Sequence, residues 1–178
     1  VRRMAEQTRR LRRLVEDLLA TSRIDAGQLI VRTRLLHLNQ VVARVLEDIK
    51  GPAVTVDDPS PLFVVADRDH VEQIVVNYLT NAFKYGAPPY RLSLDEADGA
   101  AVLRMCDGGD GVPDAFVPRL FERFSRGPTA VARDVSGTGL GLSIVRELAR
   151  AQRGEVWYQP NEPTGACFCL RLPLSATP

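Results

Sequence analysis

The chain has 178 residues, of which 45% are hydrophobic and 25% are charged, a composition ordinary for a globular protein with a sizeable core. The net charge is +1, which excludes an overall electrostatic footprint for nucleic acid. The sequence shows neither an apolar run of membrane-spanning length nor a secretory leader. The three cysteines, Cys106, Cys167 and Cys169, do not have the spacing of a disulfide framework. We therefore expect a cytoplasmic protein with Cys167 and Cys169 packed as thiols in its core.

Residues 1–24 have the pattern of one helix with a heptad seam. A single helix cannot bury such a seam against itself, so the pattern predicts a partner helix, with packing on its own domain as the alternative. Gly27 is well placed to end this helix, and residues 25–34 form a linker. The seam consists of Met4, Thr8, Leu11, Val15, Leu18 and Ser22.

Helices alternate with strands over residues 35–174. We expect a helix from its N-cap Asn39 to Lys50, and a second helix that begins at its N-cap Asp67 and carries Asn77 and Asn81. A third helix opens near residue 137, after an irregular connection over 113–136 with one short helix near 113–124. Strands are predicted near residues 53–57, 62–66, 90–96, 101–106, 154–159 and 166–172. This order predicts an α+β fold: a two-layer sandwich of a mixed, mostly antiparallel sheet and about three helices, with an N-terminal helical appendage.

Asn77, Asn81 and Lys84 follow one another at near-turn spacing on the second of these helices. An amide oxygen can ligate Mg²⁺, which prefers oxygen ligands, and an ammonium group attracts phosphate. This face therefore suits a metal–triphosphate complex, although an ordinary polar helix surface is the alternative.

Asp107 stands where a strand runs into a glycine-rich turn that contains Gly109 and Gly111. The glycines permit a sharp bend and close approach of a planar ligand. A carboxylate there can accept a hydrogen bond from an exocyclic amine such as that of adenine, and a hairpin-like turn is the alternative.

Residues 137–141 place three glycines immediately before a helix. Exposed backbone N–H groups and the positive end of the helix dipole predict a cradle for phosphate. The segment is not a Walker P-loop, because no Gly-Lys-Ser/Thr follows, and it lacks the βαβ context of a dinucleotide fingerprint.

Taken in order, these motifs resemble the catalytic ATP-binding domain of bacterial sensor histidine kinases, in the superfamily of gyrase-type and heat-shock chaperone ATPases. Residues 77–85 resemble the N box, 107–111 the first glycine box, 121–124 the F box and 137–141 the second glycine box. The N-terminal helix resembles the second helix of the family's dimerisation and phosphotransfer hairpin.

The resemblance implies a role for each matching residue. Asn81 would ligate Mg²⁺ with support from Asn77, Lys84 would contact phosphate, and Tyr85 would pack near the adenine or ribose. Asp107 would bind the adenine amine in the turn formed with Gly109 and Gly111, although Gly108 stands where the family often has Asn or Asp. Residues 113–136 would be the ATP lid, with Arg126 and Arg133 as contacts of the γ-phosphate. The backbone donors to the phosphates would be those of Gly137, Thr138, Gly139, Leu140 and Gly141.

The acceptor histidine of the family has no counterpart in the chain, since neither His37 nor His70 matches its motif. We therefore expect a histidine kinase catalytic domain that does not autophosphorylate alone, whether the chain is part of a longer membrane sensor or naturally separate. Its partner would be a histidine-bearing helix, with a response regulator as an indirect partner. A nucleotide-binding regulatory or scaffold module without kinase activity, and a Ser/Thr kinase of the same superfamily, are the alternatives.

Overall fold

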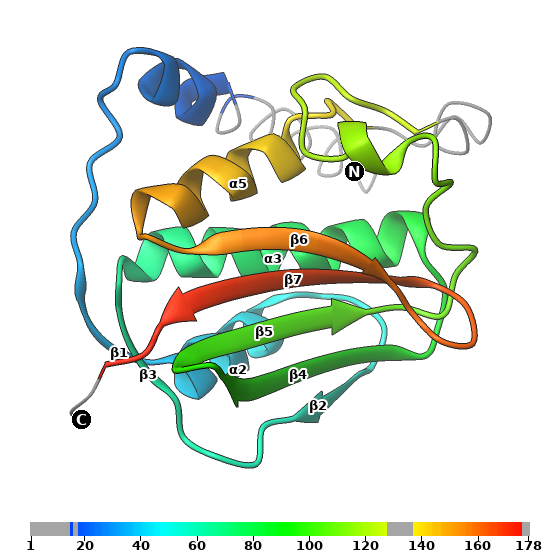
Figure 1. The fold of residues 1–178 in the computed structure, drawn as a ribbon, viewed down its shortest axis with the longest axis horizontal. Helices are drawn as coiled ribbons and strands as arrows, with labels where there is room; N and C mark the ends of the chain where they lie inside the picture. Colours follow the sequence, from blue (N-terminus) through cyan, green and yellow to red (C-terminus); the bar gives the residue numbers. More distant parts are fainter. Residues whose placement is uncertain (1–14, 16–17, 128–136, 176–178) are drawn as a thin grey trace, which may run out of the picture.

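The computed structural model describes residues 15, 18–127 and 137–175. A five-stranded sheet in the order β2-β4-β5-β7-β6 packs against helices on one side (Figure 1). Strand β2 pairs parallel with β4, and the other pairings in this sheet are antiparallel. The predicted α+β sandwich is confirmed. Its elements are β1 (Arg34–His37), α2 (Leu38–Asp48), β2 (Val54–Asp57), β3 (Phe63–Ala66), α3 (Arg68–Tyr85), β4 (Tyr90–Ala97), β5 (Ala100–Cys106), the 3-10 turn η1 (Val117–Arg119), α5 (Gly141–Ala151), β6 (Glu155–Pro160) and β7 (Ala166–Pro173).

The core lies between the sheet and α3, because alternate strand residues point to the same face. Leu92, Leu103 and Leu170 on neighbouring strands are at most 1% exposed and belong to the same core as the buried side of α3. Tyr78 of α3 is fully buried, and its hydroxyl donates a hydrogen bond of 2.7 Å to the carbonyl oxygen of Cys169 in β7. This bond satisfies a buried phenol and fixes α3 over β7.

The predicted N-cap at Asn39 is wrong. Helix α2 begins at Leu38, with His37 in the cap position and no side-chain cap. The amide of Asn39 instead accepts a 2.9 Å hydrogen bond from the Leu62 N–H and donates a 3.0 Å bond to the Ser60 carbonyl. Asn39 thus holds the loop that precedes β3 against the start of α2. This contact joins distant segments of the chain, which local capping rules do not consider.

The predicted N-cap at Asp67 is confirmed. Its carboxylate accepts hydrogen bonds from the N–H groups of Asp69 at 3.0 Å and His70 at 3.3 Å, and from the Arg32 N–H at 2.6 Å. Burial opposes ionisation of this carboxyl, but the bonds from Arg32, His70 and Asp69 together with the charge of His70 bring its pKa below the ordinary value. Asp67 therefore fixes both the start of α3 and the linker that precedes β1.

Replacing Asp67 with alanine is expected to lower the free energy of unfolding by about 1–2 kcal/mol, because α3 loses its cap. Since the pKa of Asp67 is lowered on folding, its contribution is present above pH 3.8 and is lost as the pH falls through the pKa of the folded state. Denaturant titrations at neutral and acid pH measure both effects. An Asp67→Ala protein whose deficit does not shrink on acidification would contradict this account.

The cysteines differ from the sequence-based expectation. Cys106 and Cys167 lie opposite each other in the β5–β7 register and form a disulfide, so the expected absence of a disulfide and the expected thiol at Cys167 are both wrong. Cys169 is a buried free thiol, as expected. The partners are separated by 61 residues in the sequence, and only the strand register brings them together. The argument from cysteine spacing to a reducing compartment therefore loses its basis.

In oxidised protein, replacing both Cys106 and Cys167 with alanine is expected to lower the free energy of unfolding by about 2–4 kcal/mol, because the cross-link no longer restricts the unfolded chain. A dithiol reductant should destabilise the wild-type chain and leave the double variant unchanged. Equal responses of the two proteins to the reductant in denaturant titrations would show that the disulfide does not stabilise the fold.

The N-terminal helix ends as the sequence predicts. Gly27 has a positive φ of 64°, and the N–H groups of Gly27 and Gln28 donate to the carbonyls of Ile24 and Arg23. Val15, Leu18 and Leu19 are each about half exposed, at 48%, 56% and 53%. The seam positions Met4, Thr8 and Leu11 lie outside the described residues.

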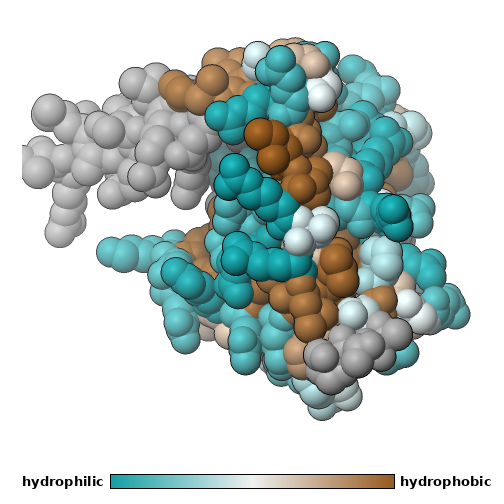
Figure 2. All heavy atoms as spheres, turned by 90° about the vertical axis from the view of Figure 1, so that its left-hand side faces the viewer, coloured by the Kyte–Doolittle hydropathy of each residue, from teal (hydrophilic) through white to brown (hydrophobic). Residues whose placement is uncertain are grey.

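A band of hydrophobic side chains crosses the mostly hydrophilic face at the left of Figure 1, as Figure 2 shows. The exposed apolar residues of the chain include Ile30 in the linker and the cross-strand pair Leu35 and Val65. Of the helices in the described part of the chain, none is both long and apolar enough to cross a membrane.

Candidate functional site

Helix α3 supplies the amide and lysine face. It runs unbroken over 18 residues, so Asn77 and Asn81 stand one turn apart and half-exposed, while Lys84 and Tyr85 are exposed near its end. The Asn77 side-chain nitrogen donates a 2.9 Å bond to the Gln73 carbonyl, which leaves its oxygen beside Gly141. The amide of Asn81 makes no hydrogen bond to protein in the part of the chain that the structure describes.

The glycine-rich segment before α5 lies against this face of α3. A Cβ on Gly141 would come within 2.7 Å of the Asn77 side-chain oxygen, and one on Gly137 within 2.8 Å of the Tyr85 hydroxyl. Leu140 is 1% exposed and anchors the segment in the core, while its N–H donates to the Thr138 hydroxyl at 3.3 Å. A larger side chain at Gly137 or Gly141 would therefore displace the side chain of Tyr85 or Asn77.

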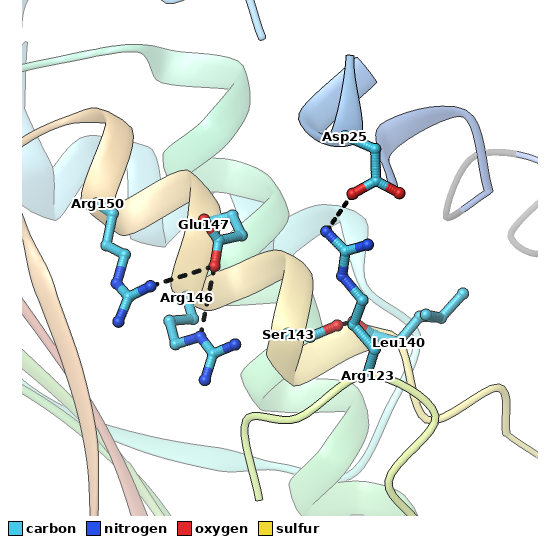
Figure 3. Close-up of polar contacts among 7 residues, drawn as sticks. All are labelled: Asp25, Arg123, Leu140, Ser143, Arg146, Glu147 and Arg150. Carbon is cyan, nitrogen blue, oxygen red and sulfur yellow. Dashed lines mark hydrogen bonds and ion pairs between the residues drawn. The ribbon is translucent and has the colours of Figure 1, made fainter. Parts of the chain in front are cut away.

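The N-terminus of α5 has the features of an anion site. Its N-cap residue, Leu140, makes no side-chain cap, and its first turn contains no acidic residue. The Ser143 hydroxyl donates to the Leu140 carbonyl at 2.8 Å, so it does not occupy the N–H groups of the first turn (Figure 3). Uncapped N–H groups and the helix dipole together favour negative charge at this position.

Asp107 is buried at the end of β5, with 3% of its surface exposed. One carboxylate oxygen accepts a 2.8 Å hydrogen bond from the Gly109 N–H, which fixes the side chain within its own turn. Burial raises the pKa of Asp107, and hydrogen bonds from the backbone of Gly109, Ala166 and Ala87 partly oppose that rise. A buried carboxylate with remaining acceptor capacity suits a ligand that brings its own N–H donor.

The Asp107 turn packs directly on the end of α3. A Cβ at Gly86 would collide with the Asp107 carboxyl group, and the Gly108 N–H donates a 2.7 Å bond to the Ala87 carbonyl. The C-terminal half of α3 therefore has the Asp107 turn at its end and the start of α5 along its side. The fold brings together three segments that are separate in the sequence.

The connection after β5 is irregular where it is described, apart from the short 3-10 helix η1, which lies within the stretch 113–124 where the sequence predicts a short helix. Pro118 has no N–H and cannot continue an α-helix through this stretch. Burial raises the pKa of Tyr85, and the positive charge of Arg126 opposes the rise, so Arg126 lies near Tyr85. Arg133 lies outside the described residues.

A salt bridge joins the F-box segment to the end of the N-terminal helix. The Arg123 guanidinium lies 2.5 Å from the Asp25 carboxylate (Figure 3). The hydrogen bond from Arg123 lowers the pKa of Asp25, and the same bond raises the pKa of Arg123. Phe124, the next residue, is 68% exposed.

Several residues around the site were missed by the sequence-based interpretation. Gly86 directly follows the helix that carries Asn77 and Asn81, and a glycine in this position is a recognisable sign of a helix end. Asn161 and Tyr158 hold the Asp107 turn from the β6–β7 hairpin, and no local pattern marks them. Asp25 is paired with Arg123 only through the tertiary fold.

Comparison with known proteins agrees with this geometry. A family model described as histidine kinase-, DNA gyrase B-, and HSP90-like ATPase matches residues 66–176, and the chain belongs to this family. The signal transduction histidine-protein kinase AfsQ2 of Streptomyces coelicolor is 35% identical over 179 residues, covering 100% of this chain and 33% of the relative. The probable sensor histidine kinase TcrY of Mycobacterium tuberculosis is 33% identical, covering 97% of this chain and 37% of the relative. The chain thus spans about a third of the length of these curated relatives.

Solved structures give the same assignment. Full-length ShkA in complex with AMPPNP has a TM-score of 0.82 at 28% identity, covering 97% of this chain and 37% of that chain. The Acinetobacter baumannii histidine kinase AdeS has a TM-score of 0.75 at 26% identity, covering 96% of this chain and 82% of that chain. The described fold is therefore that of an ATPase catalytic domain of the sensor histidine kinase type.

Proposed function

We propose that this chain is the catalytic part of a two-component histidine kinase and donates the γ-phosphoryl group of ATP to a histidine on another segment or chain. One observation carries the proposal: the start of α5 lies against Asn77 along one side of α3, and the buried carboxylate of Asp107 lies against Gly86 at the end of the same helix. Phosphoryl transfer depends mainly on positioning and charge stabilisation, and these segments supply both.

The nucleotide would lie along α3. Asp107 accepts a hydrogen bond from the adenine amine within the turn formed with Gly109 and Gly111, while Tyr85 packs near the adenine or ribose. The backbone of residues 137–141 and the ammonium of Lys84 hold the phosphates, and Arg126 and Arg133 act from the lid on the γ-phosphate. The AMPPNP complex of ShkA supports this use of the fold.

The residues present fit a Mg²⁺ ion that is held jointly by the protein and the nucleotide phosphates. They do not form a site made of protein ligands alone. Within the described residues there is no group of three or more His, Cys, Asp or Glu side chains that could hold a metal. Mg²⁺ commonly binds through one or two protein oxygens together with phosphates and water. Asn81, whose amide makes no hydrogen bond to described residues, would supply the protein oxygen, with Asn77 supporting the site.

The phosphate acceptor would lie on a partner helix. We infer that residues 1–24 are the second helix of a dimerisation and phosphotransfer hairpin, joined by the linker 25–34 to the catalytic domain 35–174. The exposed Val15, Leu18 and Leu19 support this, since they need a companion surface. A response regulator would receive the phosphoryl group from the acceptor histidine, in the cytoplasm, where ATP is available.

Neither histidine of the chain suits the acceptor role. His37 and His70 each have a buried ring nitrogen, Nδ1, without a hydrogen-bond partner, and His37 packs edge-on against Phe63 at 4.8 Å. Both are thus parts of the fold. We therefore expect no stable phosphorylation of this chain by itself.

The test uses γ-labelled ATP with Mg²⁺, first with the chain alone and then with a separate helical protein that carries a histidine acceptor motif. We expect acid-labile label on the partner's histidine and none on this chain. Acid-labile label on His37 or His70 would contradict the proposal. Label on a partner serine or threonine would instead favour the Ser/Thr kinase alternative.

A further inference from the structure

The tip of the β6–β7 hairpin closes over the backbone of Asp107. The Asp107 N–H donates a 2.9 Å hydrogen bond to the Ala166 carbonyl, which continues the β5–β7 ladder past the end of β5. Gly165, which precedes β7, has a φ of 120° and turns the chain away from a regular strand. The Asp107 carbonyl accepts its hydrogen bond from a side chain instead: the Asn161 amide donates to it at 2.9 Å.

Glycine at position 165 allows the hairpin to approach Asp107 this closely. A Cβ on Gly165 would collide with the Asp107 carbonyl oxygen, so the two backbones touch with no room for a side chain. The Asn161 N–H donates a 3.0 Å bond to the Gly165 carbonyl, which closes the tip of the hairpin. The Tyr158 hydroxyl accepts a 3.3 Å bond from the Val112 N–H and holds the far end of the same turn.

The Asp107 side chain leaves the backbone at Cα, between two peptide planes that these contacts hold. The N–H of the preceding plane donates to Ala166, and the carbonyl of the following plane accepts from Asn161. Gly109 holds the carboxylate from within the turn, and Asn161 holds the carbonyl from outside it. If the carbonyl is released, the peptide plane that follows Asp107 can rotate and shift the turn that carries the Gly109 N–H, which holds the carboxylate. The carboxylate then no longer points where a base would meet it. Small errors in such positions are costly, because hydrogen bonds weaken steeply when their angle is poor.

We propose that Asn161 is a positioning residue for base recognition, which orients the Asp107 carboxylate toward the 6-amino group of a purine. The proposal rests on the proposed nucleotide function. It adds that discrimination of the base depends on a hairpin residue that would not touch the nucleotide itself. An amide donor is required, since an aspartate at position 161 would place a second carboxylate beside the turn and offer no N–H.

The experiment compares binding of ATP with binding of purine riboside triphosphate, which lacks the 6-amine, to the whole chain with Mg²⁺. We expect Asn161→Ala and Asn161→Asp to weaken ATP binding about five- to tenfold, the range for one lost hydrogen bond. Binding of the analogue should remain unchanged, so the preference for ATP collapses. The control is Thr164→Ala, at an exposed position of the same hairpin, which should retain the preference.

A merely structural role gives a different result. If both nucleotides weaken by the same factor, or if the preference survives in both Asn161 variants, Asn161 does not position Asp107. Asn161→Asp keeps the size of the side chain, so it provides a folded protein should the alanine variant unfold. If the wild-type chain binds neither nucleotide, the proposed function itself fails together with this inference. If the wild-type chain binds both but the Asn161 variants discriminate normally, only the inference fails.

Discussion

Replacing Asn81 with alanine is expected to reduce phosphoryl transfer roughly 100-fold or more, the magnitude found when one preorganised electrostatic group is removed from an active site. In the described part of the chain its amide has no protein hydrogen bond, so the substitution removes an interaction with ligand and little of the fold. Labelled-phosphate transfer to a partner histidine measures the loss. Nucleotide binding should also lose its dependence on Mg²⁺.

The matched control for Asn81 is its neighbour on α3, Thr80→Ala. The Thr80 hydroxyl donates back to the Val76 carbonyl at 2.8 Å and is satisfied within its own helix. The Thr80 variant should retain transfer within a few-fold of the wild type, since such a local bond contributes only about 1 kcal/mol to stability. Similar losses in both variants would mean that α3 is merely perturbed and that Asn81 is not the metal ligand.

Replacing Asp107 with asparagine is expected to weaken ATP binding roughly 10- to 100-fold, the range for losing a hydrogen bond to a charged group. The free energy of unfolding should not fall together with the ATP affinity. Because burial raises the pKa of Asp107, the folded state disfavours its charge, and any stability that this titration contributes is present at low pH and lost as the pH rises through the folded pKa. A neutral amide therefore removes a buried charge and is expected to leave the free energy of unfolding unchanged or higher.

The same shift predicts the pH dependence of binding. The ionised carboxylate is the stronger acceptor, so the Asp107-dependent part of ATP affinity should decline on acidification from a pH above the ordinary value of 3.8. Calorimetric titrations of the wild-type and Asp107→Asn chains over this pH range isolate the Asp107-dependent part of the affinity, since protonation of ATP itself affects both proteins equally. Asp114→Asn, an exposed carboxylate in the following connection, serves as the control and should behave as the wild type. Parallel pH profiles for the wild type and Asp107→Asn would contradict the assigned role.

The parts of the site that could be predicted from the sequence are those determined by local geometry. Asn77 and Asn81 lie on one face of α3 because an unbroken helix sets their spacing, and the Asp67 cap that starts this helix follows from its side-chain chemistry. The glycines before α5 could likewise be read as a helix start with free N–H groups. For these features the periodic backbone does most of the positioning.

The parts that could not be predicted depend on which distant segments meet. The β5–β7 register pairs Cys106 with Cys167, and the path of the β6–β7 hairpin brings Asn161 to the Asp107 carbonyl. The pairing of Asp25 with Arg123 joins the two ends of a long stretch of chain. Asn39 shows the same limit, because its side chain serves a neighbouring loop and does not cap its own helix.

The central claim is that α3, the Asp107 turn and the start of α5 form one ATP site, and calorimetric titration of the chain with ATP in the presence and absence of Mg²⁺ tests it most directly. We predict saturable binding of one nucleotide per chain that is strengthened by Mg²⁺. Asn81→Ala should remove the strengthening by Mg²⁺, and Asp107→Asn should weaken binding with or without the metal. Absence of saturable binding, or binding that neither substitution changes, would contradict the account.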